Sequence, residues 1–182
     1  TRVRSSAASD VYKRQVPDPI SRSCRFRASA SAYYNRTPAI AGNQQKWTYS
    51  AWVKRGSLGA QQLFAAGAGT AGSPECHINF EDNLNFQIYD GSTSLMLLRS
   101  TAVYRDPSAW YHVVVAIDTT QATAANRAFL YINGQAITSF VFSTYPTQNL
   151  NTQVNATTAH RISSSTRVNA YYYDGYMTEI NF

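Results

Sequence analysis

Aromatic, amide and imidazole side chains recur at every second position in several extended segments of this chain. Because alternate residues of a β-strand point to opposite faces, burying Ile78 and Phe80 leaves their neighbours outward. The same alternation in the other segments defines an outward set: Trp52, His77, Asn79, Gln87, Tyr89, Trp110 and His112. Aromatic rings stack on the C–H faces of sugars and amides bond to hydroxyl groups, so this set predicts a saccharide-binding surface.

The same reasoning leaves a competing interpretation open. Burying Phe86 and Ile88 exposes Asn85 as well as Gln87 and Tyr89. An outward face of this kind can instead be covered by loops or by a neighbouring subunit, and its tryptophans are then packing residues. The sequence favours this second interpretation over a ligand site.

Residues for catalysis are not found in the required patterns. Glycoside hydrolysis needs two carboxylates placed across the scissile bond. Glu81 and Asp82 are adjacent, so a strand would point them to opposite faces, and Glu179 stands alone. No serine lies in a Gly-x-Ser-x-Gly elbow. The sequence therefore predicts a protein without catalytic residues.

Metal and cofactor signals are equally weak. The three histidines, His77, His112 and His160, lack the spacing of metal ligands. The glycine-rich run 67–72 is followed by Ser-Pro rather than by a helix, so it predicts a flexible loop and not a nucleotide site. We expect no metal and no cofactor.

Calcium at a loop is the alternative, because four aspartates lie near turns: Asp82, Asp90, Asp118 and Asp174. Two of them precede glycine, which favours ordinary turn chemistry.

Charge and hydropathy exclude two classes of partner. The formal net charge of +6 is concentrated near the start of the chain, because residues 1–15 carry four basic residues and one acidic residue. No basic patch remains in the body, so nucleic-acid binding is not expected. No apolar run is long enough to cross a bilayer.

Cys24 and Cys76 could pair, but each lies in a strand-like run as a small apolar residue, and two cysteines do not indicate a disulfide framework.

The two ends of the chain differ from the rest. Residues 5–15, SSAASDVYKRQ, resemble one translated reading frame of a transposase adaptor used in sequencing libraries, so residues 1–15 are interpreted as an adaptor scar. Residues 1–20 are expected to be non-native or disordered, and residues 21–182 to form one domain. The chain stops at Phe182 within an apolar run, so we expect this domain to be truncated at its C-terminus.

Strand-like runs separated by turn signals fill the chain from Cys24 onward, whereas helical periodicity is nearly absent. The clearest element is the pair of strands Trp110–Asp118 and 127–133. The second runs into Asn133-Gly134, a dipeptide typical of tight hairpins, and a further strand is expected over 136–142. A last strand is expected over 171–182, and a long polar surface loop over 144–158. The pattern predicts an all-β protein with two antiparallel sheets packed as a sandwich.

Four segments carry a resemblance to a known family, in this order: SCRFRASASAYYNRTPA, KWTYSAWVKRGSLGAQQLFAAG, SAWYHVVVAIDTTQATAANRAFLYINGQAITSF and YYYDGYMTEINF. Together they resemble the laminin-G-like branch of the concanavalin A-like jelly rolls. More narrowly, they are similar to domains of marine bacteriophage tail and structural proteins. The resemblance implies a jelly-roll fold but does not fix a function, because this fold supports lectins, glycanases and structural domains.

Three functional hypotheses follow from the resemblance and the missing catalytic residues. The first is a non-catalytic recognition module of a virion or an extracellular protein, with a glycan or a host-surface polymer and other tail proteins as partners. The second is a purely structural virion domain without a ligand. The third is a glycanase fragment that lacks its catalytic strand.

Overall fold

The computed structural model describes residues 22–182, which form two antiparallel sheets. The all-β sandwich predicted from the sequence is confirmed. The helical elements of this part of the chain are two short 3₁₀ turns, η1 (Ala28–Ala30) and η2 (Ala124–Asn126). The predicted non-native segment, residues 1–20, lies outside the described residues.

The first sheet has six strands in the order β1-β13-β3-β8-β9-β10. Its long central pair, β3 and β8, is in register from Lys46 opposite Asp118 to Val53 opposite Tyr111. The strands are β1 (Cys24–Phe26), β3 (Lys46–Arg55), β8 (Tyr111–Asp118), β9 (Ala128–Ile132), β10 (Gln135–Ala136) and β13 (Gly175–Asn181).

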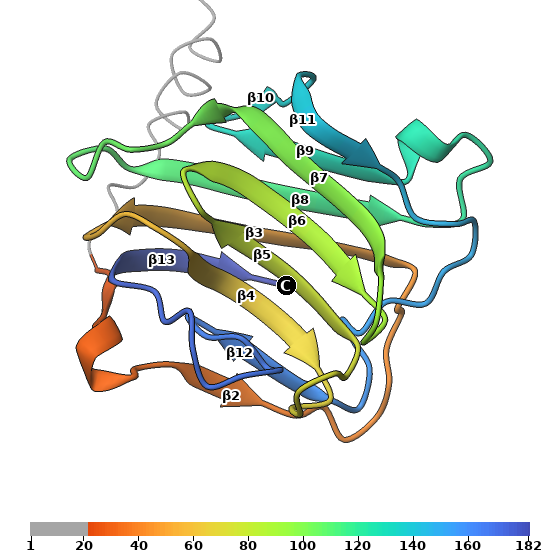
Figure 1. Cartoon of the computed structure of the whole chain (residues 1–182), viewed down its shortest axis with the longest axis horizontal. Helices are drawn as coiled ribbons and strands as arrows, with labels where there is room; N and C mark the ends of the chain where they lie inside the picture. Colours follow the sequence, from red (N-terminus) through yellow and green to blue (C-terminus); the bar gives the residue numbers. More distant parts are fainter. Residues whose placement is uncertain (1–21) are drawn as a thin grey trace, which may run out of the picture.

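The second sheet has seven strands in the order β11-β7-β6-β5-β4-β12-β2, and it lies over the first in the view of Figure 1. Its strands are β2 (Tyr34–Arg36), β4 (Gln61–Gly67), β5 (Glu75–Phe80), β6 (Asn83–Tyr89), β7 (Ser94–Val103), β11 (Phe140–Thr144) and β12 (Ala159–Ile162).

The core lies between the two sheets and is built from alternate residues of each strand. Tyr49, Ala51 and Val53 of β3 are fully buried, as the alternation predicts. They meet side chains of the second sheet such as Phe64, whose ring lies 5.3 Å from that of Tyr49. Trp47 packs edge-on against Phe86, with 5.7 Å between ring centroids. Burial of these aromatic and branched side chains is the main favourable contribution to folding.

The predicted hairpin at Asn133-Gly134 is present, with positive φ values of 51° and 77° at its two central residues. The strand predicted over 136–142 is wrong in one respect. It breaks after Ala136, and the chain crosses to the second sheet, where Phe140 pairs with Ser100 of β7. The crossing segment keeps an apolar and β-branched composition, so the local sequence does not show the change of sheet.

Two further segments differ from the sequence prediction. The last strand begins at Gly175 rather than at residue 171. Tyr171 has a φ of 59°, and its carbonyl accepts a hydrogen bond from the backbone N–H of Gln62 instead of pairing in the first sheet. The 144–158 segment is not only a surface loop, because Thr152 and Val154 within it are buried. The Trp47 indole N–H donates to Thr152 Oγ1 at 2.9 Å, and that hydroxyl donates to the Gln44 carbonyl at 2.8 Å.

Replacing Thr152 by valine is expected to lower the free energy of unfolding by about 2 kcal/mol, because it leaves the Trp47 indole N–H without an acceptor and removes one of the two hydrogen bonds that the Gln44 carbonyl accepts. Valine has nearly the same shape, so the effect reports the lost hydrogen bonds. Urea unfolding measures it, with the exposed Thr157→Val change as the control. Equal stability losses in the two variants would contradict the prediction.

Both cysteines are free. Cys76 is buried as a small core residue of β5, whereas Cys24 is exposed on β1 with its sulfur 3.0 Å from the Tyr34 hydroxyl. Within residues 22–182, no helix has the length and apolar character that a membrane crossing requires.

Candidate functional site

The outer face of the second sheet carries a polar surface on β4, β5 and β6. Cys76, Ile78 and Phe80 of β5 point into the core, so the alternate residues of this strand point outward. Strand pairing arranges the outward residues in three rows across the sheet: Gly67–Glu75–Tyr89, Ala65–His77–Gln87 and Gln62–Asn79–Asn85.

A loop of residues 163–174, which joins β12 to β13, docks on one end of this surface through the buried carboxylate of Glu75. The Oε1 atom accepts hydrogen bonds from the Ser165 hydroxyl at 2.8 Å, the Thr166 amide at 2.6 Å and the Thr166 hydroxyl at 2.9 Å. The Arg167 amide also donates to it, at 3.1 Å. The Oε2 atom lies 3.0 Å from Nδ1 of His77. Glu75 therefore fixes the start of the 163–174 loop against β5.

These contacts keep the carboxylate charged. Burial alone would raise the pKa of Glu75, but hydrogen bonds from His77, Ser165 and Thr166 lower it from 4.5 to about 2. A general acid would need a pKa raised toward neutral pH. Glu75 is thus a structural anion and is unsuited to donate a proton in catalysis.

The side chain of Arg167 extends from this anchored loop over the ring of Tyr89. The centre of its guanidinium lies 4.0 Å from the Tyr89 ring centroid, within the range of a cation–π contact. The Tyr89 hydroxyl donates to the Ser92 carbonyl at 2.9 Å, which holds the ring in place. The Nε atom of Arg167 is buried and has no hydrogen-bond partner among the described residues.

The loop and the three rows enclose a groove of about 420 Å³, which we call the β5 groove. Side-chain amides from three strands, Gln62, Asn79 and Gln87, line it, and their amide groups make no hydrogen bond within residues 22–182. Tyr171 stands at its edge and is half exposed. The other lining residues are Ala60, Glu75, His77, Glu81, Ser165, Arg167 and Val168.

The second carboxylate of the groove, Glu81, is paired. A terminal nitrogen of Arg99 lies 3.1 Å from each of its oxygens. The Nε atom of Arg99 donates to the Asn85 side chain at 2.8 Å, so Asn85 is buried and not exposed as the alternation predicted. An outward direction on a strand gives exposure only where no neighbouring side chain covers the residue.

The structure divides the predicted binding residues between opposite faces of the sandwich. His77, Asn79 and Gln87 line the β5 groove, and Tyr89 supports Arg167 beside it. Trp52 and His112 lie on the outward face of the first sheet, where they pair across β3 and β8 with their rings stacked 4.9 Å apart. Trp110 precedes β8 and is partly buried. These seven residues do not form one surface.

Sequence reasoning missed the two charged residues that organise the groove. Glu75 matches no catalytic or metal-ligand pattern in the sequence. Arg167 follows a run of serines and threonine that carries no strand signal. The available signal for Glu75 was its place in the alternation, two residues before His77 and four before Asn79.

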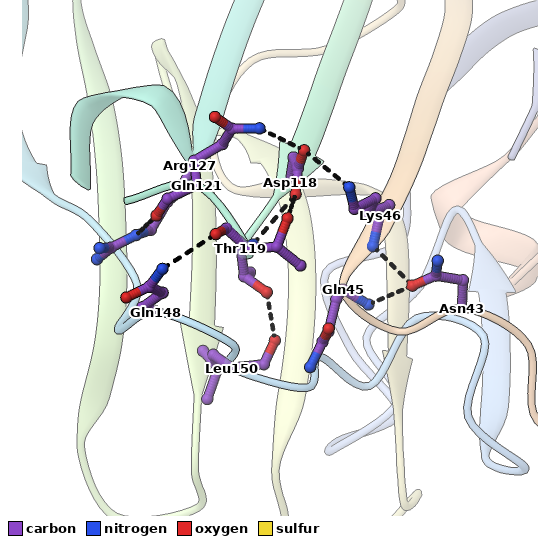
Figure 2. Close-up of polar contacts among 10 residues, drawn as sticks. Asn43, Gln45, Lys46, Asp118, Thr119, Gln121, Arg127, Gln148 and Leu150 are labelled. Atoms are coloured by element: carbon purple, nitrogen blue, oxygen red, sulfur yellow. Dashed lines mark hydrogen bonds and ion pairs between the residues drawn. The ribbon is translucent and has the colours of Figure 1, made fainter. Parts of the chain in front are cut away.

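The loop 118–121 forms a separate polar network at the end of β8, shown in Figure 2. Asp118 accepts hydrogen bonds from the Thr120 hydroxyl at 2.5 Å and from the Gln121 amide at 2.7 Å, and Lys46 lies 3.4 Å away. The bonds from Thr120 and Gln121 lower the pKa of Asp118 to about 2 despite an opposing contribution from desolvation. The network ties the loop to β3 and to the 145–150 segment, where the Thr119 hydroxyl donates to the Leu150 carbonyl.

The other three aspartates considered for calcium also have partners within the protein. Asp82 pairs with Arg105 at 2.7 Å and Asp174 with Arg25 at 3.1 Å, while Asp90 accepts bonds from Ser92 and Thr93 in its turn. No three His, Cys, Asp or Glu side chains of residues 22–182 gather in a metal-binding group.

His160 is buried away from the groove. It lies between the Thr158 carbonyl at Nδ1 and the Asn155 amide at Nε2.

The sandwich of two antiparallel sheets defines the class of the protein as a jelly-roll domain of the concanavalin A-like type. The sequence profile of the family described as "Concanavalin A-like lectin/glucanases superfamily" (Laminin_G_3) matches residues 29–182. The chain belongs to this family, so the laminin-G-like resemblance is confirmed. No curated protein is similar to it in sequence.

Several solved structures share the fold at low sequence identity. A carbohydrate-binding module, CBM40 of the Ruminococcus gnavus IT-sialidase, bound to α2,3 sialyllactose, aligns with 82% of this chain and 91% of its own at 14% identity and a TM-score of 0.56. Domains LG4-5 of the mouse laminin α1 chain align with 91% of this chain and 43% of their own at 11% identity and a TM-score of 0.58. At these identities the likeness establishes the fold alone.

Proposed function

We propose that this domain is a non-catalytic saccharide-binding module whose ligand lies in the β5 groove. The observation that carries the proposal is a set of three side-chain amides, Gln62, Asn79 and Gln87, which have no hydrogen-bond partner among the described residues and lie beside a half-exposed tyrosine. Amides present both donors and acceptors to sugar hydroxyls, and an aromatic ring offers an apolar face to the sugar ring. The proposal is supported by the CBM40 module aligned above, whose structure is bound to α2,3 sialyllactose.

The state of the carboxylates supports a role without catalysis. Glu75 accepts bonds at both oxygens, and Glu81 is paired with Arg99. Neither carboxylate of the groove is available as a free acid or nucleophile, whereas glycoside hydrolysis needs a pair of them. Binding without calcium is part of the proposal and is tested by comparing a chelator with added calcium.

Replacing Asn79 or Gln87 by alanine is expected to weaken saccharide binding about tenfold or more, because each change removes hydrogen bonds to the ligand. A glycan array identifies the ligand, and calorimetry then measures the affinities. Trp52→Ala is the matched control, because Trp52 lies on the opposite sheet. If Trp52→Ala abolished binding and Asn79→Ala did not, the site would lie on the first sheet instead.

The second candidate function is a structural domain of a virion, and the outward face of the first sheet favours it. Trp52 and His112 stack there, and Phe129 and Tyr176 of the same sheet are exposed. A neighbouring subunit could cover such side chains.

The phage-tail and extracellular settings remain part of the proposal for either function. The genes adjacent to this one test them, since tail and baseplate genes would support a virion setting.

A further inference from the structure

We propose that Arg167 binds a carboxylate group of the ligand, so that the β5 groove prefers acidic sugars to neutral ones. The inference rests on the proposed saccharide-binding function and specifies its ligand class. Three observations carry it: the absence of a carboxylate partner for Arg167 within residues 22–182, the pairing of the other charges near the groove, and the fixed position of Arg167.

The charges around the groove leave one cation uncompensated. Ion pairs among residues 22–182 join Arg25, Lys46, His77, Arg99 and Arg105 to acidic residues, and none of them includes Arg167. Both acids that line the groove are already engaged, Glu75 by the 163–174 loop and Glu81 by Arg99. An incoming carboxylate would therefore meet a guanidinium that no carboxylate of the described part of the chain neutralises.

The position of Arg167 is fixed before any ligand arrives. Its backbone amide donates to Glu75 Oε1 and to the Ser165 hydroxyl, each at 3.1 Å. Its guanidinium rests on the Tyr89 ring, which uses one face of the planar group, and its N–H groups have no hydrogen-bond partner within residues 22–182. A side chain held in this way loses little conformational freedom on binding.

The planar shape of the guanidinium adds a reason for an anionic partner. A carboxylate can accept two parallel N–H bonds from a guanidinium, so it can engage both terminal nitrogens of Arg167 together. A sugar hydroxyl offers neither the charge nor the paired acceptors.

The test compares ligands that differ by an acidic group. The probes are α2,3-sialyllactose against lactose, and methyl glucuronide against methyl glucoside, measured by calorimetry on the full chain. In the wild type, at least one acidic member is expected to bind about tenfold or more tightly than its neutral partner. Arg167→Gln is expected to remove this preference while neutral binding persists, and Arg167→Lys to retain part of it, because lysine keeps the charge without the planar fork.

Arg105→Gln is the control for net charge, because Arg105 is exposed and pairs with Asp82 away from the groove lining. It is expected to leave the preference unchanged. Equal binding of acidic and neutral probes to the wild type, or a preference that survives in Arg167→Gln, would overturn the inference and leave the proposed function standing. If none of the arrayed or titrated saccharides bound, the proposed function would fail, and this inference with it.

Discussion

Replacing Glu75 by alanine is expected to lower the free energy of unfolding by about 3–5 kcal/mol and to abolish ligand binding in the β5 groove. The change removes the acceptor of four hydrogen bonds from Ser165, Thr166 and Arg167, three of them from buried residues. Unpaired donors must then be hydrated, which requires the 163–174 loop to leave β5. Denaturant unfolding measures the stability, and amide hydrogen exchange at residues 165–167 reports the loop.

The same carboxylate predicts a pH dependence with a defined sign. Because the folded-state pKa of Glu75 is lowered from 4.5 to about 2, its stabilisation is fully present above pH 4.5 and is lost as the pH falls toward 2. At 1.36 kcal/mol for each pKa unit, the loss amounts to about 3 kcal/mol.

Glu75→Gln isolates this contribution, since Asp90 and Asp118 also have lowered pKa values and stay in both proteins. The variant is expected to show a flatter stability profile between pH 4.5 and 2. Parallel profiles for the variant and the wild type would show that Glu75 is not the anchor.

Replacing Gly67 by alanine is expected to lower the free energy of unfolding by about 2–3 kcal/mol, because the added methyl group has no space. A Cβ atom at residue 67 would lie 2.5 Å from the Pro74 carbonyl oxygen and 2.6 Å from the Thr166 hydroxyl. Gly67 pairs with Glu75 across β4 and β5, so the clash falls on the residues that seat the 163–174 loop. We expect saccharide binding to weaken in the same variant.

Gly72→Ala provides the comparison for Gly67. Gly72 has a φ of 78°, and a Cβ atom there would meet nothing within 4 Å, so only backbone strain applies. That strain costs about 1 kcal/mol. Thermal unfolding and calorimetry of the two variants separate the effects. A binding loss of the same size in both would refute the role given to Gly67.

Sequence reasoning succeeded where structure depends on neighbouring residues. The Asn133-Gly134 turn formed because its two residues tolerate positive φ, and Tyr49, Ala51 and Val53 point inward because a strand alternates. His77 and Gln87 face the same side of the second sheet for the same reason. These features follow from the local backbone, and the sequence therefore contains them directly.

Reasoning from the sequence failed where a residue depends on a distant partner. Asn85 has an outward direction but is covered by Arg99, 14 positions further along the chain. The segment after Ala136 kept a strand-like composition while it changed sheets. Alternation assigned Trp52 and Trp110 to an outward face, but it does not say to which sheet that face belongs.

The sequence by itself determined that the chain is an all-β sandwich of the concanavalin A-like type, with amide and imidazole side chains outward on β5 and β6. Only the tertiary structure decided that these side chains form one groove with Arg167 while Trp52 and His112 lie on the other sheet. The physical reason is that alternation is set by each strand alone. The groove depends on hydrogen bonds between Glu75 and residues 90 or more positions away, and no local pattern records such bonds.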